Sequence, residues 1–106
     1  MAPDPGFVDH VMARLEPFGD VTTKAMFGGN GIWESGDMFA LITADSELHF
    51  KVDVQTRPRY EQAECAQFRT MPYWSVPGDV LEDDTQLAEW ADEAIEVGHA
   101  TATRNR

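Results

Sequence analysis

The spacing of apolar residues predicts a helix near the start of the chain. Asp4 and Pro5 are typical of a helix N-cap and of the first helical position. Behind them, apolar residues recur at helical intervals, at Phe7, Val8, Val11, Met12 and Leu15. Pro17 and Gly19 then predict the end of this helix.

From Val21 onward apolar and polar residues alternate, which is the period of a strand. The strands expected in this part cover residues 21–27, 32–34, 38–43 and 48–52. In the last of them Leu48 and Phe50 face inward, while His49 and Lys51 face outward. The pattern predicts an antiparallel meander with one covered face.

The remaining residues predict a short helix over 56–64 and two short strands over 67–71 and 73–76. Pro72 places this strand pair at a sheet edge, because proline cannot donate to the ladder. A long helix follows, with the apolar stripe Leu87, Trp90, Ala91, Ala94 and Ile95.

The limits of the long helix are also predicted. Asp83 caps it, with Gln86 at the third position as in a capping box. Gly98 predicts its end, and residues 101–106 are expected to be a frayed tail. The order is therefore helix, three or four strands, helix, two short strands, helix. This order predicts one two-layer α+β domain over residues 1–100, with helices on one face of an antiparallel sheet.

Composition excludes several classes of protein. The 106 residues suffice for one domain, and 42% hydrophobic with 25% charged residues is an ordinary globular balance. Nineteen acids against eight bases give a net charge of −11, so direct nucleic-acid binding is not expected. A single cysteine, Cys65, excludes an internal disulfide framework. With no long apolar run and no signal-peptide pattern, we expect a cytoplasmic protein without membrane contact.

Charged residues are unevenly distributed. From residue 70 to residue 103 there are acids but no Lys or Arg, while Lys51, Arg57, Arg59 and Arg69 make up half of the bases. These bases form either a patch for an anionic partner or scattered surface charges. The acids form either a helix that docks a basic partner or a solvated helix face. Tyr73 and Trp74 are adjacent in the last strand, so their side chains point to opposite faces of the sheet. Either both faces are covered there, or one of the two aromatic side chains contacts a partner. The candidates for partner contact are Lys51, Arg57, Arg59, Tyr73 and Trp74.

No constellation predicts catalysis, a metal site or a cofactor. The glycines between residues 28 and 31 precede no helix pattern, so they indicate a tight turn rather than a phosphate loop. None of the three histidines has a ligand partner at metal-binding spacing. Acids near Cys65 would raise the pKa of its thiol rather than activate it. We therefore expect no catalytic residue, no metal and no cofactor.

Two segments are distinctive together: KAMFGGNGI over residues 24–32 and MPYWSVP over residues 71–77. Between them lie MFALI at 38–42 and LHFKVD at 48–53, and LAEWA follows at 87–91. In this order, the chain from about Phe7 to Val97 resembles the TfoX (Sxy) N-terminal domain family, as a single-domain member.

The resemblance implies a two-layer fold of the order α-β(3)-α-β(2)-α. Longer members of the family include regulators of natural competence, which act on transcription together with other proteins. It therefore implies a non-enzymatic regulatory or protein-interaction domain with protein partners related to transcription, and it offers no catalytic residues. The alternative is a small-ligand-binding domain or enzyme with a pocket between sheet and helices, near His49 and Lys51. A homodimer stays open, because small two-layer domains often leave a sheet edge to be covered.

Overall fold

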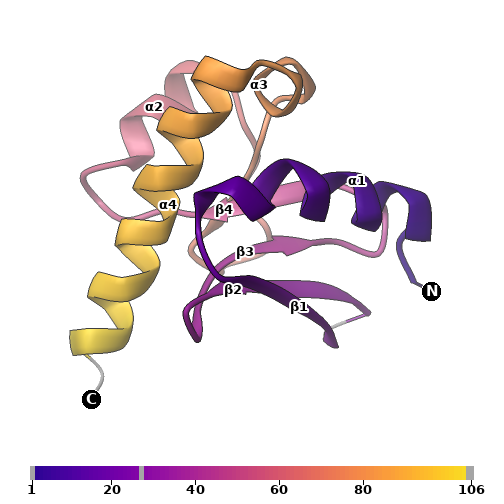
Figure 1. The fold of residues 1–106 in the computed structure, drawn as a ribbon. Helices are drawn as coiled ribbons and strands as arrows, with labels where there is room; N and C mark the ends of the chain where they lie inside the picture. Colours follow the sequence, from indigo (N-terminus) through magenta and orange to yellow (C-terminus); the bar gives the residue numbers. More distant parts are fainter. Residues whose placement is uncertain (1, 27, 105–106) are drawn as a thin grey trace.

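A computed structural model describes residues 2–26 and 28–104 of the chain. These residues form a five-stranded antiparallel sheet in the order β1-β2-β3-β4-β5, together with helices (Figure 1). The elements are α1 (Pro5–Leu15), the 3-10 turn η1 (Glu16–Phe18), β1 (Val21–Met26), β2 (Gly29–Glu34), β3 (Asp37–Ile42), β4 (Leu48–Lys51), α2 (Arg57–Gln62), β5 (Tyr73–Ser75), α3 (Gly78–Glu82) and α4 (Asp84–Arg104). The predicted α+β class is confirmed.

The order of elements differs from α-β(3)-α-β(2)-α on both sides of α2. Four strands precede α2, and the segment 67–71 does not form a strand. Within it Gln67 makes an isolated bridge to Trp74, and Arg69 takes a φ of 55°, which interrupts an extended chain. The N–H of Met71 then donates to the carbonyl of Phe68 over 3.0 Å. This short hairpin leaves β5 as the last strand of the sheet.

Both predicted helix caps are confirmed. The Asp4 carboxylate accepts the N–H of Phe7 over 3.2 Å, and the Asp83 carboxylate accepts the N–H of Gln86 over 2.9 Å. Each bond satisfies a backbone donor that a helix start leaves without an intrahelical acceptor. The sequence therefore marks the beginning of α1 and of α4 correctly.

The predicted end of the last helix at Gly98 is wrong. Gly98 lies inside α4 because the helix passes so close to β3 that only a glycine fits. A Cβ there would lie 2.7 Å from the carbonyl oxygen of Met38 and 3.2 Å from Cβ of Phe39. The helix continues to Arg104, so residues 101–104 of the expected tail are helical, and 105–106 lie outside the described residues.

The glycine run is only partly the predicted turn. Gly28, with a φ of 76°, lies between β1 and β2. Gly29 and Gly31 belong to β2 and are buried. A Cβ on Gly29 would collide with the carbonyl oxygen of Ile42, and one on Gly31 would lie 2.5 Å from the sulfur of Met26. At Gly29 the close approach of the β3 backbone, rather than turn conformation, requires glycine, whereas at Gly31 the near atoms belong to the side chains of Met26 and Trp33. The end of the expected strand at Phe27 lies outside the described residues.

All helices contribute to one core on the same side of the sheet, and Figure 1 shows α1 running along the strands and α4 at a steep angle to them. The Tyr60 ring of α2 meets the Trp90 ring of α4 edge-on, with centroids 4.8 Å apart. Leu48 and Phe50 face this core, as predicted. The largest fully buried side chains are Tyr60, Phe39, Phe50, Leu15, Ile32, Ile42, Leu87 and Val11. Packing of four helices here leaves the opposite sheet face without a helical layer.

Candidate interaction surfaces

We define the helix-free face as the sheet face opposite the helices. Cross-strand register places Lys24, Gly31, Leu41, His49 and Ser75 in one row across all five strands. Neighbouring rows add further side chains to the same face: Met26, Trp33, Met38, Lys51 and Tyr73. Among these strand positions there are two lysines and a histidine but no carboxylate, in a chain whose net charge is −11.

The cations of the helix-free face lie over aromatic rings. The Lys24 ammonium is 5.4 Å from the centroid of Trp33, and the Lys51 ammonium is 5.5 Å from that of Tyr73. At the margin of this face, the Arg69 guanidinium lies 4.8 Å from the Phe68 centroid. Such cation–π pairs hold the lysine stems flat on the sheet and keep the charges at its surface.

His49 and Lys51 lie on the helix-free face, as the alternation predicts, but neither is fully solvated. His49 is 3% exposed and meets the Phe68 ring edge-on at 5.6 Å. Burial lowers the pKa of His49 below its ordinary value. Burial also lowers the pKa of Lys51, the Arg104 charge acts in the same direction, and Asp37 opposes both. Being on this face, the two residues do not line the space between sheet and helices.

The five candidates for partner contact do not form one surface. Lys51 and Tyr73 are paired on the helix-free face, where Tyr73 is 4% exposed and the Lys51 ammonium lies over its ring. Trp74 is paired with Phe50 on the opposite face and packs against the core. Arg57 and Arg59 belong to α2: Arg57 is exposed, and Arg59 lies 5.5 Å from the Trp90 ring centroid.

Two residues of the helix-free face, Lys24 and Trp33, were not among the sequence candidates. They are distant from Lys51 in sequence, and only the strand register brings them onto its face. The sequence does contain one indication for Lys24, which is the alternation of residues in β1. Once the start of β2 at Gly29 is known, this alternation places Lys24 on the face opposite the buried side of the strand.

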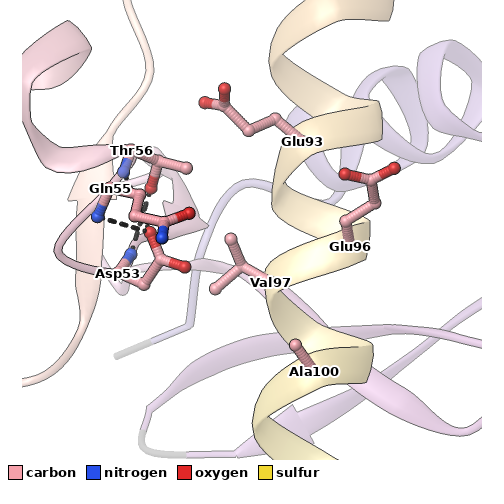
Figure 2. A pocket seen from close by; sticks show the side chains of 7 residues that line it. All are labelled: Asp53, Gln55, Thr56, Glu93, Glu96, Val97 and Ala100. Atoms are coloured by element: carbon pink, nitrogen blue, oxygen red, sulfur yellow. Dashed lines mark hydrogen bonds between the residues drawn. The ribbon is translucent and has the colours of Figure 1, made fainter.

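A second feature is a cleft of about 440 Å³ beside α4, where the loop after β4 faces the helix (Figure 2). Asp53 organises the loop: its carboxylate accepts the N–H groups of Gln55 and Thr56, over 3.0 and 2.9 Å. The cleft is lined by Asp53, Gln55, Thr56, Glu93, Glu96, Val97 and Ala100. A neighbouring hollow of about 330 Å³ continues along the helix past Val54 to Arg104.

The cleft is acidic, and its carboxylates affect one another. Figure 2 shows Glu93 reaching from α4 toward the loop. Burial raises the pKa of Glu93, with Arg59 lowering it and the charges of Asp53 and Glu96 raising it further. The Arg59–Glu93 pair is long, at 3.9 Å, and within the described chain Oε1 of Glu93 has no hydrogen-bond partner. The cleft therefore suits a cationic group.

In the part of the chain that the structure describes, no group of three His, Cys, Asp or Glu side chains is arranged to hold a metal ion. Cys65 is a free thiol whose pKa burial raises, although a hydrogen bond from Ser75 acts in the opposite direction. Over residues 2–26 and 28–104, none of the helices combines the length and the apolar character required to cross a membrane.

Comparison with known proteins agrees with this fold. No curated protein matches the chain closely enough to count as a relative. The model of the TfoX N-terminal domain matches residues 13–98, which is most of the chain, and this match includes the sheet and all but the end of α4. The chain therefore belongs to the TfoX N-terminal domain family.

Proposed function

We propose that the chain is a non-enzymatic, regulatory protein-interaction domain that docks an acidic segment of a partner protein on its helix-free face. The observation that carries the proposal is that Lys24, Lys51 and Arg69 each lie over an aromatic ring, while the strand positions of this face hold no carboxylate. The competence regulators that the sequence resembles support a partner related to transcription.

Charge distribution favours an acidic partner over a neutral one. Arg14, Arg57 and Arg59 are paired with carboxylates at distances of 2.8–3.9 Å, so much of their charge is used within the fold. The cations of the helix-free face instead lie over rings, and an aromatic face accepts none of the N–H groups of a lysine as a carboxylate would. A complementary potential of this kind steers association and selects the partner.

Aromatic anchors beneath the cations favour a protein segment as the occupant. Trp33 is half-buried and borders Met26 and Gly31, so apolar contact area lies next to the Lys24 charge. Tryptophan next to a cation is the composition of binding hot spots. A nucleic-acid backbone would meet the same cations, but the net charge of −11 would repel the rest of the strand.

The test replaces one basic residue at a time, either on the helix-free face or on α2. Lys24→Glu and Arg57→Glu make the same change of charge at two exposed positions, one on the helix-free face and one on α2. A photo-crosslinking residue at position 24 first identifies the partner in host extract, and the purified partner is then titrated with each variant. We expect Lys24→Glu to weaken binding about tenfold, or about 1.4 kcal/mol, and Arg57→Glu to leave it unchanged. Equal affinity of both variants, or crosslinks to nucleic acid alone, would overturn the proposal.

The acidic cleft beside α4 favours the alternative, a domain that binds a small cationic ligand. Its volume of about 440 Å³ and its three carboxylates, Asp53, Glu93 and Glu96, support this alternative. A thermal-shift screen of amines and metabolites separates the two functions, since a ligand of the folded state raises the melting temperature by mass action.

A further inference from the structure

His99 of α4 is held between two carboxylates of the β2–β3 hairpin. Its Nδ1 lies 2.7 Å from an oxygen of Asp37, and its Nε2 lies 2.7 Å from an oxygen of Glu34. Glu34 is itself fixed, because its second oxygen accepts the Asp20 N–H over 3.0 Å and the Ser35 hydroxyl over 2.6 Å. We call His99, Glu34 and Asp37 the histidine clasp.

The clasp requires a protonated ring. Only the imidazolium form has an N–H on both nitrogens, so only this form donates to both carboxylates at once. The neutral ring carries one N–H and directs its other lone pair at a carboxylate oxygen 2.7 Å away. Loss of one proton therefore replaces a charge-assisted hydrogen bond with a repulsive contact.

We propose that the histidine clasp is a proton-dependent latch, which holds the last turns of α4 on the β2–β3 hairpin and releases them when His99 loses its proton. The latch lies where α4 ends, so the residues it would release include Ala100 and Arg104. Both line the hollow that continues the acidic cleft. Opening of the latch would therefore remove one wall of that hollow, independently of the function proposed for the helix-free face.

The surrounding charges favour a closed latch at neutral pH. Hydrogen bonds to Asp37 and then to Glu34 raise the pKa of His99, and burial acts in the opposite direction. The hydrogen bond from Ser35 lowers the pKa of Glu34. Lys51 on β4 also interacts with the charge of Asp37, but the two carboxylates in direct contact with the His99 ring are the closer charges.

The sign of the pH dependence follows from these shifts. Because the pKa of His99 is higher in the fold than in an unfolded chain, the clasp stabilises the fold fully below about pH 6.5. This stabilisation is lost as the pH rises through the raised pKa of the folded protein. At the acid end it is lost as Glu34 becomes protonated, at a pKa that the Ser35 hydrogen bond lowers from its ordinary value.

The test is NMR of the full chain between pH 5.5 and 9, with the His99 ring resonances followed beside the amide hydrogen-exchange protection of α4. We expect His99 to titrate at a higher pH than a peptide histidine, and the protection of residues 99–104 to fall about fivefold across that titration. Protection in the first turns of α4 should stay constant, because they lie far from the clasp.

Three variants make the result decisive. His99→Gln should remove the pH dependence at the end of α4, while His10→Gln, which removes the α1 partner of Glu82 on α3, should keep it. Glu34→Gln retains an oxygen acceptor but loses one charge, so it should move the His99 titration to lower pH. A pH-independent end of α4 in the wild-type chain, or the same dependence in His99→Gln, would overturn the proposal. So would a His99 titration that is unmoved in Glu34→Gln.

Discussion

At Gly98 the packing of α4 on the sheet leaves no room for a methyl group. A Cβ there would lie 2.7 Å from the Met38 carbonyl oxygen and 3.3 Å from the Met38 carbonyl carbon. Both atoms belong to the backbone of β3, so they cannot rotate away as a side chain would. Gly98→Ala therefore forces the helix away from the sheet, or distorts it, at the residue beside the histidine clasp.

Two opposing terms decide the sign of the Gly98→Ala effect. Alanine stabilises a helix interior relative to glycine by about 1 kcal/mol. Overpacking of a buried contact destabilises by about 1–3 kcal/mol, and a displaced His99 would weaken two hydrogen bonds in addition. Because the obstructing atoms are backbone atoms, we expect the destabilisation from overpacking to lie in the upper part of its range. The net loss is then about 1–2 kcal/mol in the free energy of unfolding.

Gly78→Ala is the matched control, because Gly78 begins α3 and a Cβ there meets no atom within 4 Å. We expect it to stabilise the fold by about 0.4–1 kcal/mol, mainly by restricting the unfolded chain. Urea unfolding followed by circular dichroism measures both variants. Gly98→Ala should lower the midpoint by about 0.5–1 M with an unchanged slope. A midpoint at or above that of the wild type, while Gly78→Ala behaves as expected, would refute the packing argument.

Two further predictions concern the cap of α4 and the free thiol. Asp83→Ala should lower the melting temperature by about 5 °C, because the Gln86 N–H loses its side-chain acceptor, whereas Asp79→Ala in the neighbouring helix should lower it less. Cys65 should react with iodoacetamide more slowly at pH 7 than a free thiol does, because burial raises its pKa, and mass spectrometry should show fast modification only in urea. A fast reaction in the native chain would show that the thiol is not protected.

The sequence predicts those parts of the fold that depend on local chemistry. Asp4 and Asp83 are recognisable as caps, because a cap needs only a side-chain oxygen near the first N–H groups of a helix. The alternation of Leu48, His49 and Phe50 likewise assigns faces correctly, since a strand reverses its side chains at every residue.

What the sequence does not predict depends on contacts between distant segments. Gly98 has the same local signal as a helix stop, and only its distance from Met38 shows that it is a packing residue. Similarly, nothing near His99 indicates that its partners are Glu34 and Asp37, more than 60 residues earlier in the chain. Side-chain partners of this kind are fixed by sheet register and helix placement, which single-sequence patterns do not encode.

The same limit explains why composition misjudges the surface. A net charge of −11 suggests a uniformly acidic protein, yet the carboxylates are concentrated on helices and loops, and both lysines lie on the helix-free face. The period of two places both lysines on this face, because alternate residues of a strand occupy opposite faces. An acidic partner would therefore meet two lysines on the helix-free face, whereas most carboxylates of the chain lie elsewhere. Selection of both the partner and its orientation would follow from this single arrangement.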